Sequence, residues 1–136
     1  MVSAVRATLE AAWTPAEPHG LVNRRRDLQT DLASLRAVHA DALADAGDDP
    51  AADERWPVSA AVEELAVLAL SFPPHRRPPD PQHARDFLDH LDVLRTAIAV
   101  GVPPPLACPE VAGYPRTSAA AAALTDAATA AARVVD

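Results

Sequence analysis

The chain has 136 residues, 49% of them hydrophobic, which is enough to bury the core of a single domain over residues 1–136 without disulfides or a structural metal. Its formal net charge of −7 repels phosphate backbones, which disfavours general nucleic-acid binding. No run of about 18 apolar residues occurs, so no membrane-spanning segment is predicted.

Composition also indicates where the protein works. All 12 basic side chains are arginines, and alanine and proline are abundant, a bias that indicates a GC-rich bacterial genome. Cys108, the single cysteine, cannot form an internal disulfide and fits a reducing cytoplasm. Arg6 and Glu10 interrupt the apolar N-terminus, which therefore lacks the core of a signal peptide. We expect a soluble cytoplasmic protein.

Two helices are predicted in the first third of the chain. A short one covers residues 3–13, where Ser3 can cap it, and the prolines and glycine of residues 14–20 end it. A long one runs from about Leu21 to Ala46 and ends at Gly47. Leucine and alanine recur along the long helix at spacings of three, four and seven, which predicts one buried face. This face consists of Leu28, Leu32, Leu35, Ala42 and Leu43.

Residues 58–72 are apolar on nearly every side, and Glu63 and Glu64 are their only charges. A helix that is hydrophobic all round is normally buried. This stretch therefore predicts the central helix of a bundle, with the other helices packed against it. Residues 48–57 are expected to form a connection with at most one helical turn, and Pro57 is expected to begin the central helix.

The next predicted helix has clear ends. Asp80 can cap it, Pro81 fits its first position, and Gly101 lies just past its last turn. A continuous face of apolar residues predicts its buried side. This face consists of Ala84, Phe87, Leu88, Leu91, Leu94 and Ile98.

The remaining residues predict a long connection and a last helix. Residues 102–117 are rich in proline and are expected to cross the bundle surface, anchored by Leu106 and Tyr114. Thr117 or Ser118 would cap an alanine-rich helix that extends to about Val135. Its packing residues are predicted to be Leu124, Ala128, Ala131 and Val135.

These elements predict an all-α fold, a small bundle of four main helices plus the short N-terminal one. No alternating run of β-branched residues predicts a strand. The alanine-rich last helix and the few aromatic residues imply that helices approach closely. We expect an exposed helix face to be covered by a second copy of the chain in a homodimer.

Polar residues at positions that the helical period assigns to the core are the first candidates for chemistry. His39 and Asp31 lie in or beside the leucine stripe of the long helix, Glu63 lies in the central helix, and Arg95 is expected to face the core. In one interpretation Arg95 pairs with Asp31 or Glu63, and His39 acts as a general base. In the other, Arg95 bonds free carbonyls at its helix end and His39 is a core histidine, because structural ion-pair networks resemble active sites.

A metal site and an anion site are two further hypotheses. His83, Asp86 and His90 lie on one side of a predicted helix, but the two histidines are about 10.5 Å apart along its axis, too far to share one ion. We therefore predict no metal ion and no cofactor. Residues 24–26 and 75–77 are the basic clusters, which could together bind an anion or remain two exposed charge runs.

Arg77 and His83 are separated by five residues, three of which are prolines. This pair resembles the arginine–histidine signature of HEPN-type ribonucleases, small helical bundles that dimerise. The resemblance covers these two residues alone, and it departs from the family pattern because Arg77 lies outside the predicted helix. It implies a dimeric ribonuclease in which Arg77 and His83 take part.

Two classes of function remain. The first is a small helical binding or accessory protein that acts through a helix face or as a homodimer, with another protein or a small molecule as further partners. The second is a small acid–base or hydrolytic enzyme that uses His39 or His83 with nearby Asp, Glu or Arg. Histidines gathered in one cleft would favour the enzyme, and histidines on separate surfaces would favour the binding protein.

Overall fold

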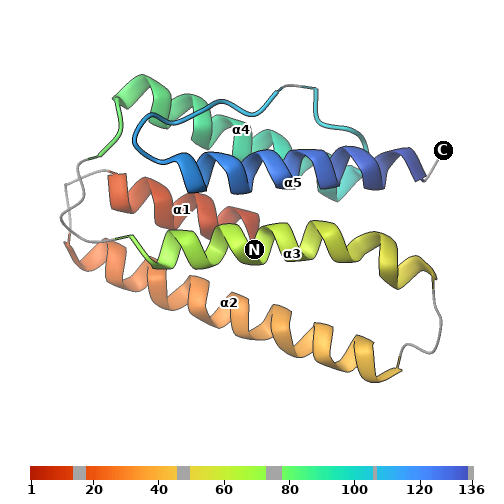
Figure 1. Cartoon of the computed structure of the whole chain (residues 1–136). Helices are drawn as coiled ribbons and strands as arrows, with labels where there is room; N and C mark the ends of the chain where they lie inside the picture. Colours follow the sequence, from red (N-terminus) through yellow and green to blue (C-terminus); the bar gives the residue numbers. More distant parts are fainter. Residues whose placement is uncertain (14–17, 46–49, 73–77, 106, 135–136) are drawn as a thin grey trace.

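Five helices and no strand form the part of the chain that the structure, a computed structural model, describes (Figure 1). That part comprises residues 1–13, 18–45, 50–72, 78–105 and 107–134, with no side chains described at 18–19 and 50–55. The all-α prediction is confirmed. Within these residues no helix has the length and apolar character needed to cross a membrane. The helices are α1 (Val2–Trp13), α2 (Pro18–Asp45), α3 (Pro50–Leu70), α4 (Pro81–Val100) and α5 (Pro115–Val134).

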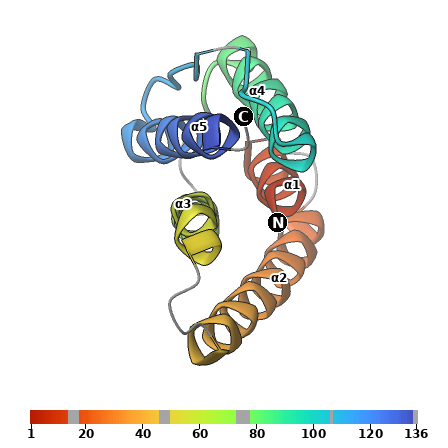
Figure 2. The same cartoon turned by 90° about the vertical axis from the view of Figure 1, so that its right-hand side faces the viewer.

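The helices form an arc around α3. Seen end-on, α5, α4, α1 and α2 follow one another, and α3 lies on the concave side (Figure 2). α3 packs against α5, α1 and α2, as expected of a central helix, whereas α4 packs against α1 and α5 instead. The expectation that α3 is buried all round is wrong: Leu65 is fully buried, but Val67 on the opposite face is 40% exposed. One side of the arc is open, and no described helix closes it.

α1 is much shorter than α2, and this mismatch shapes the bundle. At 1.5 Å per residue, the 12 residues of α1 span about 18 Å and the 28 residues of α2 span about 42 Å. α2 therefore buries Leu28 and Leu32, whereas Leu43 is 68% exposed and Ala42 is exposed. The predicted leucine stripe is correct for the first half of α2 and wrong for the second, where residues 40–45 are all exposed.

α3 is longer than predicted at its N-terminal end. It begins at Pro50 rather than at Pro57, which lies inside the helix. The prediction failed because an internal proline normally costs a helix about 3 kcal/mol. The alanines and glutamate that precede Pro57 favour helix, and Pro50 suits a first helical position. Asp49, the expected cap, lies outside the described residues.

α4 has the predicted ends and the predicted buried face. The Asp80 carboxylate accepts hydrogen bonds from the backbone N–H groups of Gln82 and His83, at 2.9 and 3.4 Å. Gly101 ends the helix in the left-handed conformation, at φ 76°, where a Cβ would be strained. Phe87, Leu88, Leu91 and Leu94 are buried, and Ala84 and Ile98 are half-buried.

α4 and α5 run parallel, so the chain between them returns along the length of the bundle (Figure 1). This return explains why the predicted surface connection is so long. Tyr114 is a buried anchor as predicted, Val111 is a second one, and Leu106 lies outside the described residues. α5 begins at Pro115 rather than at Thr117 or Ser118, because proline suits a first helical position. Ser118 Oγ instead accepts from the Val111 N–H and donates to the Tyr114 carbonyl, both at 2.9 Å.

Four of the five aromatic residues form one cluster, near the turns where α1 and α3 end and α4 and α5 begin. Trp13 lies 5.8 Å from Phe87 and 5.4 Å from Tyr114 between ring centroids, and Phe72 lies 5.2 Å from Tyr114. Edge-to-face contacts of this kind add about 0.5–1.5 kcal/mol per pair to the free energy of burial. Four helices are therefore held together at this end, which we call the closed end.

Truncating side chains on the two faces of α3 should change the free energy of unfolding by different amounts. Leu65→Ala removes a fully buried side chain and should lower the free energy of unfolding by about 2–5 kcal/mol. Val67→Ala on the exposed face should change it by no more than about 0.5 kcal/mol. Urea unfolding followed by circular dichroism measures both, and equal losses would show that both faces are buried.

Candidate functional site

Exposed hydrophobic side chains gather at the end of the molecule opposite the aromatic cluster. There α2, α4 and α5 end and α3 begins, on the right in Figure 1. Val38 and Leu43 on α2 are 63% and 68% exposed, and Trp56 on α3 is 48% exposed. We call this the open end. Six of the eight large exposed hydrophobic residues in the described chain belong to it: Val38, Leu43, Trp56, Val100, Val102 and Val134.

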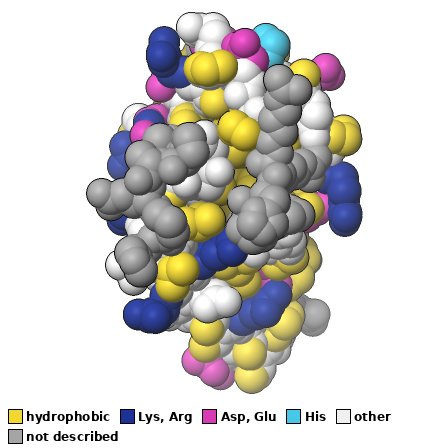
Figure 3. All heavy atoms as spheres, turned by 90° about the vertical axis from the view of Figure 1, so that its left-hand side faces the viewer, with side chains coloured by type: hydrophobic (Ala, Val, Ile, Leu, Met, Phe, Trp, Pro, Cys, Tyr) yellow, Lys and Arg dark blue, Asp and Glu magenta, His cyan; other side chains and the backbone are white. Residues whose placement is uncertain are grey.

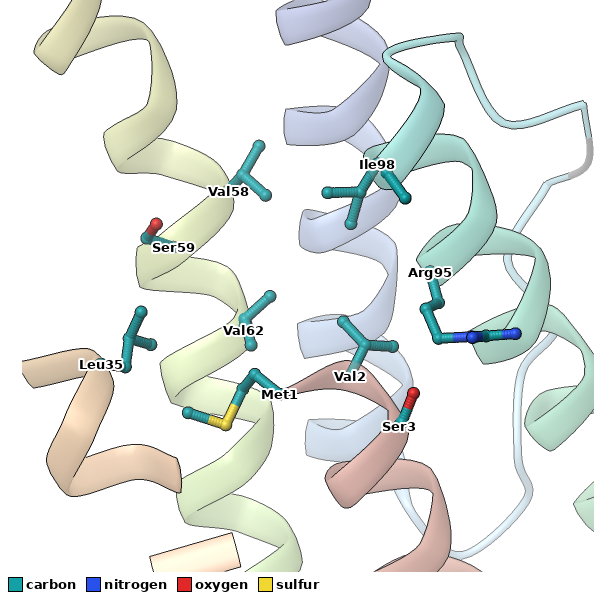
Figure 4. Close-up of a pocket in the computed structure, with 10 residues that line it drawn as sticks. Met1, Val2, Ser3, Leu35, Val58, Ser59, Val62, Arg95 and Ile98 are labelled. Carbon is teal, nitrogen blue, oxygen red and sulfur yellow. The ribbon is translucent and has the colours of Figure 1, made fainter. Parts of the chain in front are cut away.

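An apolar groove of about 300 Å³ leads into the open end, bordered by α1, α2, α3 and α4. Figure 4 shows Val2, Val58, Val62 and Ile98 projecting toward one another from three of these helices. Leu35 closes the groove on the side of α2. The groove lies beside the first residues of α1, since Met1, Val2 and Ser3 are part of its lining.

Arg95 lies at the edge of this groove. Its side chain is exposed, so the prediction that it faces the core is wrong. In Figure 4 its guanidinium points away from Val58 and Val62, which leaves the aliphatic stem toward the groove. No hydrogen bond or ion pair of Arg95 occurs among the described residues, and α4 does not contact α2 there. Asp31 on α2 is therefore not its partner.

The other predicted catalytic residues have separate surroundings. The His39 ring is half-buried, with its centroid 5.0 Å from that of Trp56. Glu63 accepts a hydrogen bond from Arg36 Nε at 2.7 Å, in an ion pair between α3 and α2. Asp31 is exposed. The structure thus does not bring Asp31, His39, Glu63 and Arg95 together in one cluster.

The three predicted metal ligands on α4 also lie in different surroundings. His83 and Asp86 are exposed, and Asp86 accepts a hydrogen bond from the Gln82 side chain at 2.8 Å. His90 is buried and faces α5 instead. No group of three potential metal ligands occurs among the residues that the structure describes.

The basic clusters give no anion site that can be described. Residues 75–77, which include Arg77, lie outside the described residues, so the pairing of Arg77 with His83 has no structural counterpart here. Arg25 donates a hydrogen bond to the Phe72 carbonyl just after α3 and so joins the start of α2 to that end. In Figure 3, which looks onto the closed end, arginine and acidic side chains are dispersed among hydrophobic ones.

His90 is a core residue with a defined tautomer. Thr125 Oγ1 donates to the Ala121 carbonyl at 2.9 Å, so the same oxygen must accept the proton of His90 Nε2, which lies 3.0 Å away. Nδ1 then carries the lone pair, and it is buried without a hydrogen-bond partner. Burial lowers the pKa of His90, so the imidazole is neutral near pH 7.

Cys108 shows no sign of a reactive thiol. Burial raises the pKa of its thiol to about 11, so almost none is present as the nucleophilic thiolate at neutral pH. This agrees with the absence of any neighbour in the sequence that would lower its pKa. Cys108 and the exposed His83 are both among the residues that line a groove of about 730 Å³.

No protein-family model, curated protein or solved structure matches the chain. The resemblance to HEPN-type ribonucleases therefore rests on Arg77 and His83 alone. The sequence pattern did not predict the open end. Val38 lies in the second half of α2, which the pattern assigned to a buried face.

The buried His90 should make stability depend on pH. In the unfolded chain histidine binds a proton below its ordinary pKa of about 6.5, whereas folded His90 resists protonation. The stability that neutral His90 contributes is therefore fully present above about pH 6.5, the ordinary pKa of histidine in the unfolded chain. This contribution is lost as the pH falls below that value. His90→Gln, which keeps a donor toward Thr125, should reduce the fall in Tm between pH 7 and 5. His83→Gln, at an exposed site on the same helix, should retain it. Identical pH profiles for wild type and His90→Gln would contradict this assignment.

Proposed function

We propose that the protein is a helical interaction module that binds a protein partner through the apolar surface of its open end. The observation that supports this is that exposed Val38, Leu43 and Trp56 lie at the same end of the molecule as an apolar groove bordered by Leu35 and Val58 of the same two helices. Scattered exposed hydrophobic residues are normal, but a contiguous patch on a small protein usually marks an interaction site.

Trp56 gives the surface the character of a protein interface. Tryptophan is enriched among the residues that contribute most to protein–protein binding, because it buries a large area at little cost in side-chain entropy. The His39 ring supports one side of Trp56, so the indole is held in place while almost half of it stays exposed. Such an arrangement presents an anchor that is already ordered before a partner binds.

The alternative, a small acid–base or hydrolytic enzyme, receives less support. His39 lies at the open end, His83 is exposed on the first turn of α4, and His90 is buried against α5. Histidines on separate surfaces favour the binding protein. We place the module in a bacterial cytoplasm, where the single thiol of Cys108 would stay reduced.

Site-specific photo-crosslinking in cells tests the proposed function. A photoreactive amino acid at Leu43 should give discrete crosslinked products with a protein, which is either the same chain or a different one. The same amino acid at Asp89, exposed on α4 away from the groove, should give few or none. Equal crosslinking from the two positions, or none from Leu43, would contradict an interaction surface at the open end.

A further inference from the structure

We infer that the occupant of the groove is a second copy of the chain, which packs the C-terminal part of its α2 over the groove, beside the first residues of α1. This inference rests on the proposed function and names the partner. Three features of the described residues carry it: the shape of the projecting helix, the charges at the groove edge and the symmetry of the pairing.

The end of α2 has the shape that the groove requires. Beyond Leu32 the helix continues for 13 residues, or about 20 Å, and there Arg36 and His39 contact Glu63 and Trp56 of α3. Val38 and Ala42 lie one turn apart on one exposed side of α2. This side would place small apolar residues against the valines and Ile98 of the groove.

The charges are complementary. Asp41 and Asp45 follow Val38 at spacings of three and seven, so they border the same side of α2. Both are exposed, and neither forms an ion pair with another described residue. Arg95 is the cation at the groove edge, and it also lacks a counter-ion among the described residues. A helix with an apolar side and an acidic border thus matches an apolar groove with a basic border.

The pairing closes on itself. If α2 of one copy enters the groove of the other with Asp45 near Arg95, a two-fold axis places the second α2 in the first groove, with the same contact repeated. Each interface residue then takes part in two equivalent contacts, one from each copy, and both grooves are filled. Such an arrangement gives a dimer, not a chain of copies, because no groove remains for a third.

Sedimentation velocity on the full chain, with charge variants, tests this inference. The wild type should show a concentration-dependent monomer–dimer equilibrium. Asp45→Arg and Arg95→Asp should each raise the dimer Kd about tenfold or more, because each replaces two attractions by two repulsions. The double variant restores opposite charges and should bring the Kd back to within about threefold of the wild type.

Two controls separate the pairing from loss of folding. Arg85→Asp changes an exposed charge on the first turns of α4, outside the groove, and should leave the Kd unchanged. Circular dichroism should show full helix content in every variant, because Asp45 and Arg95 are both exposed. A wild type that stays monomeric, or single variants that both dimerise like Arg85→Asp, would overturn the inference.

The same results distinguish this inference from the proposed function. A monomeric protein that still crosslinks from Leu43 to a different protein would refute the second copy as occupant and leave the interaction surface in place. A monomeric protein without crosslinks from Leu43 would refute both.

Discussion

The packing of α1 against three other helices is the interaction on which the rest of the structure depends. α1 contacts α2, α3 and α4, so it joins the two sides of the arc, yet it has 12 residues beside the 28 of α2. Beside α1, Leu28 and Leu32 are buried; farther along α2, Val38 and Leu43 are exposed, and an apolar groove lies next to the first residues of α1. The candidate site therefore depends on how α1, α2, α3 and α4 come together, since all four helices border the groove.

The two ends of the bundle differ in chemistry as well as in packing. The closed end holds Trp13, Phe72, Phe87 and Tyr114 in mutual contact, which fixes four helices relative to one another. The fifth aromatic residue, Trp56, lies at the open end against His39 and remains 48% exposed. The closed end thus contributes stability, while the open end keeps apolar surface available. A rigid closed end also lets the open end present its side chains in fixed positions.

Local signals in the sequence predicted the helices well, because caps and periodicity act within a few residues. Asp80, Pro81 and Gly101 correctly gave the ends of α4. Packing partners could not be predicted in this way. The stripe on α2 does not show that α1 is too short to cover Leu43, and the period of α4 placed Arg95 inward although it lies at an exposed edge. For the same reason His39, Asp31 and Glu63 were grouped as a cluster, when only the tertiary arrangement decides which helix faces which. The expectation of a covered helix face stays a prediction.

Hydrogen–deuterium exchange at increasing protein concentration tests the central claim, that the open end is an association surface, most directly. Residues 40–45 in the last turns of α2 are all exposed in a single chain, so their amides should exchange quickly in dilute solution. If a second copy covers them, their exchange should slow as the concentration rises, together with that of the amides around Arg95 and Ile98, while the closed end stays unchanged. Exchange in α2 that is equally fast at every concentration would contradict the claim.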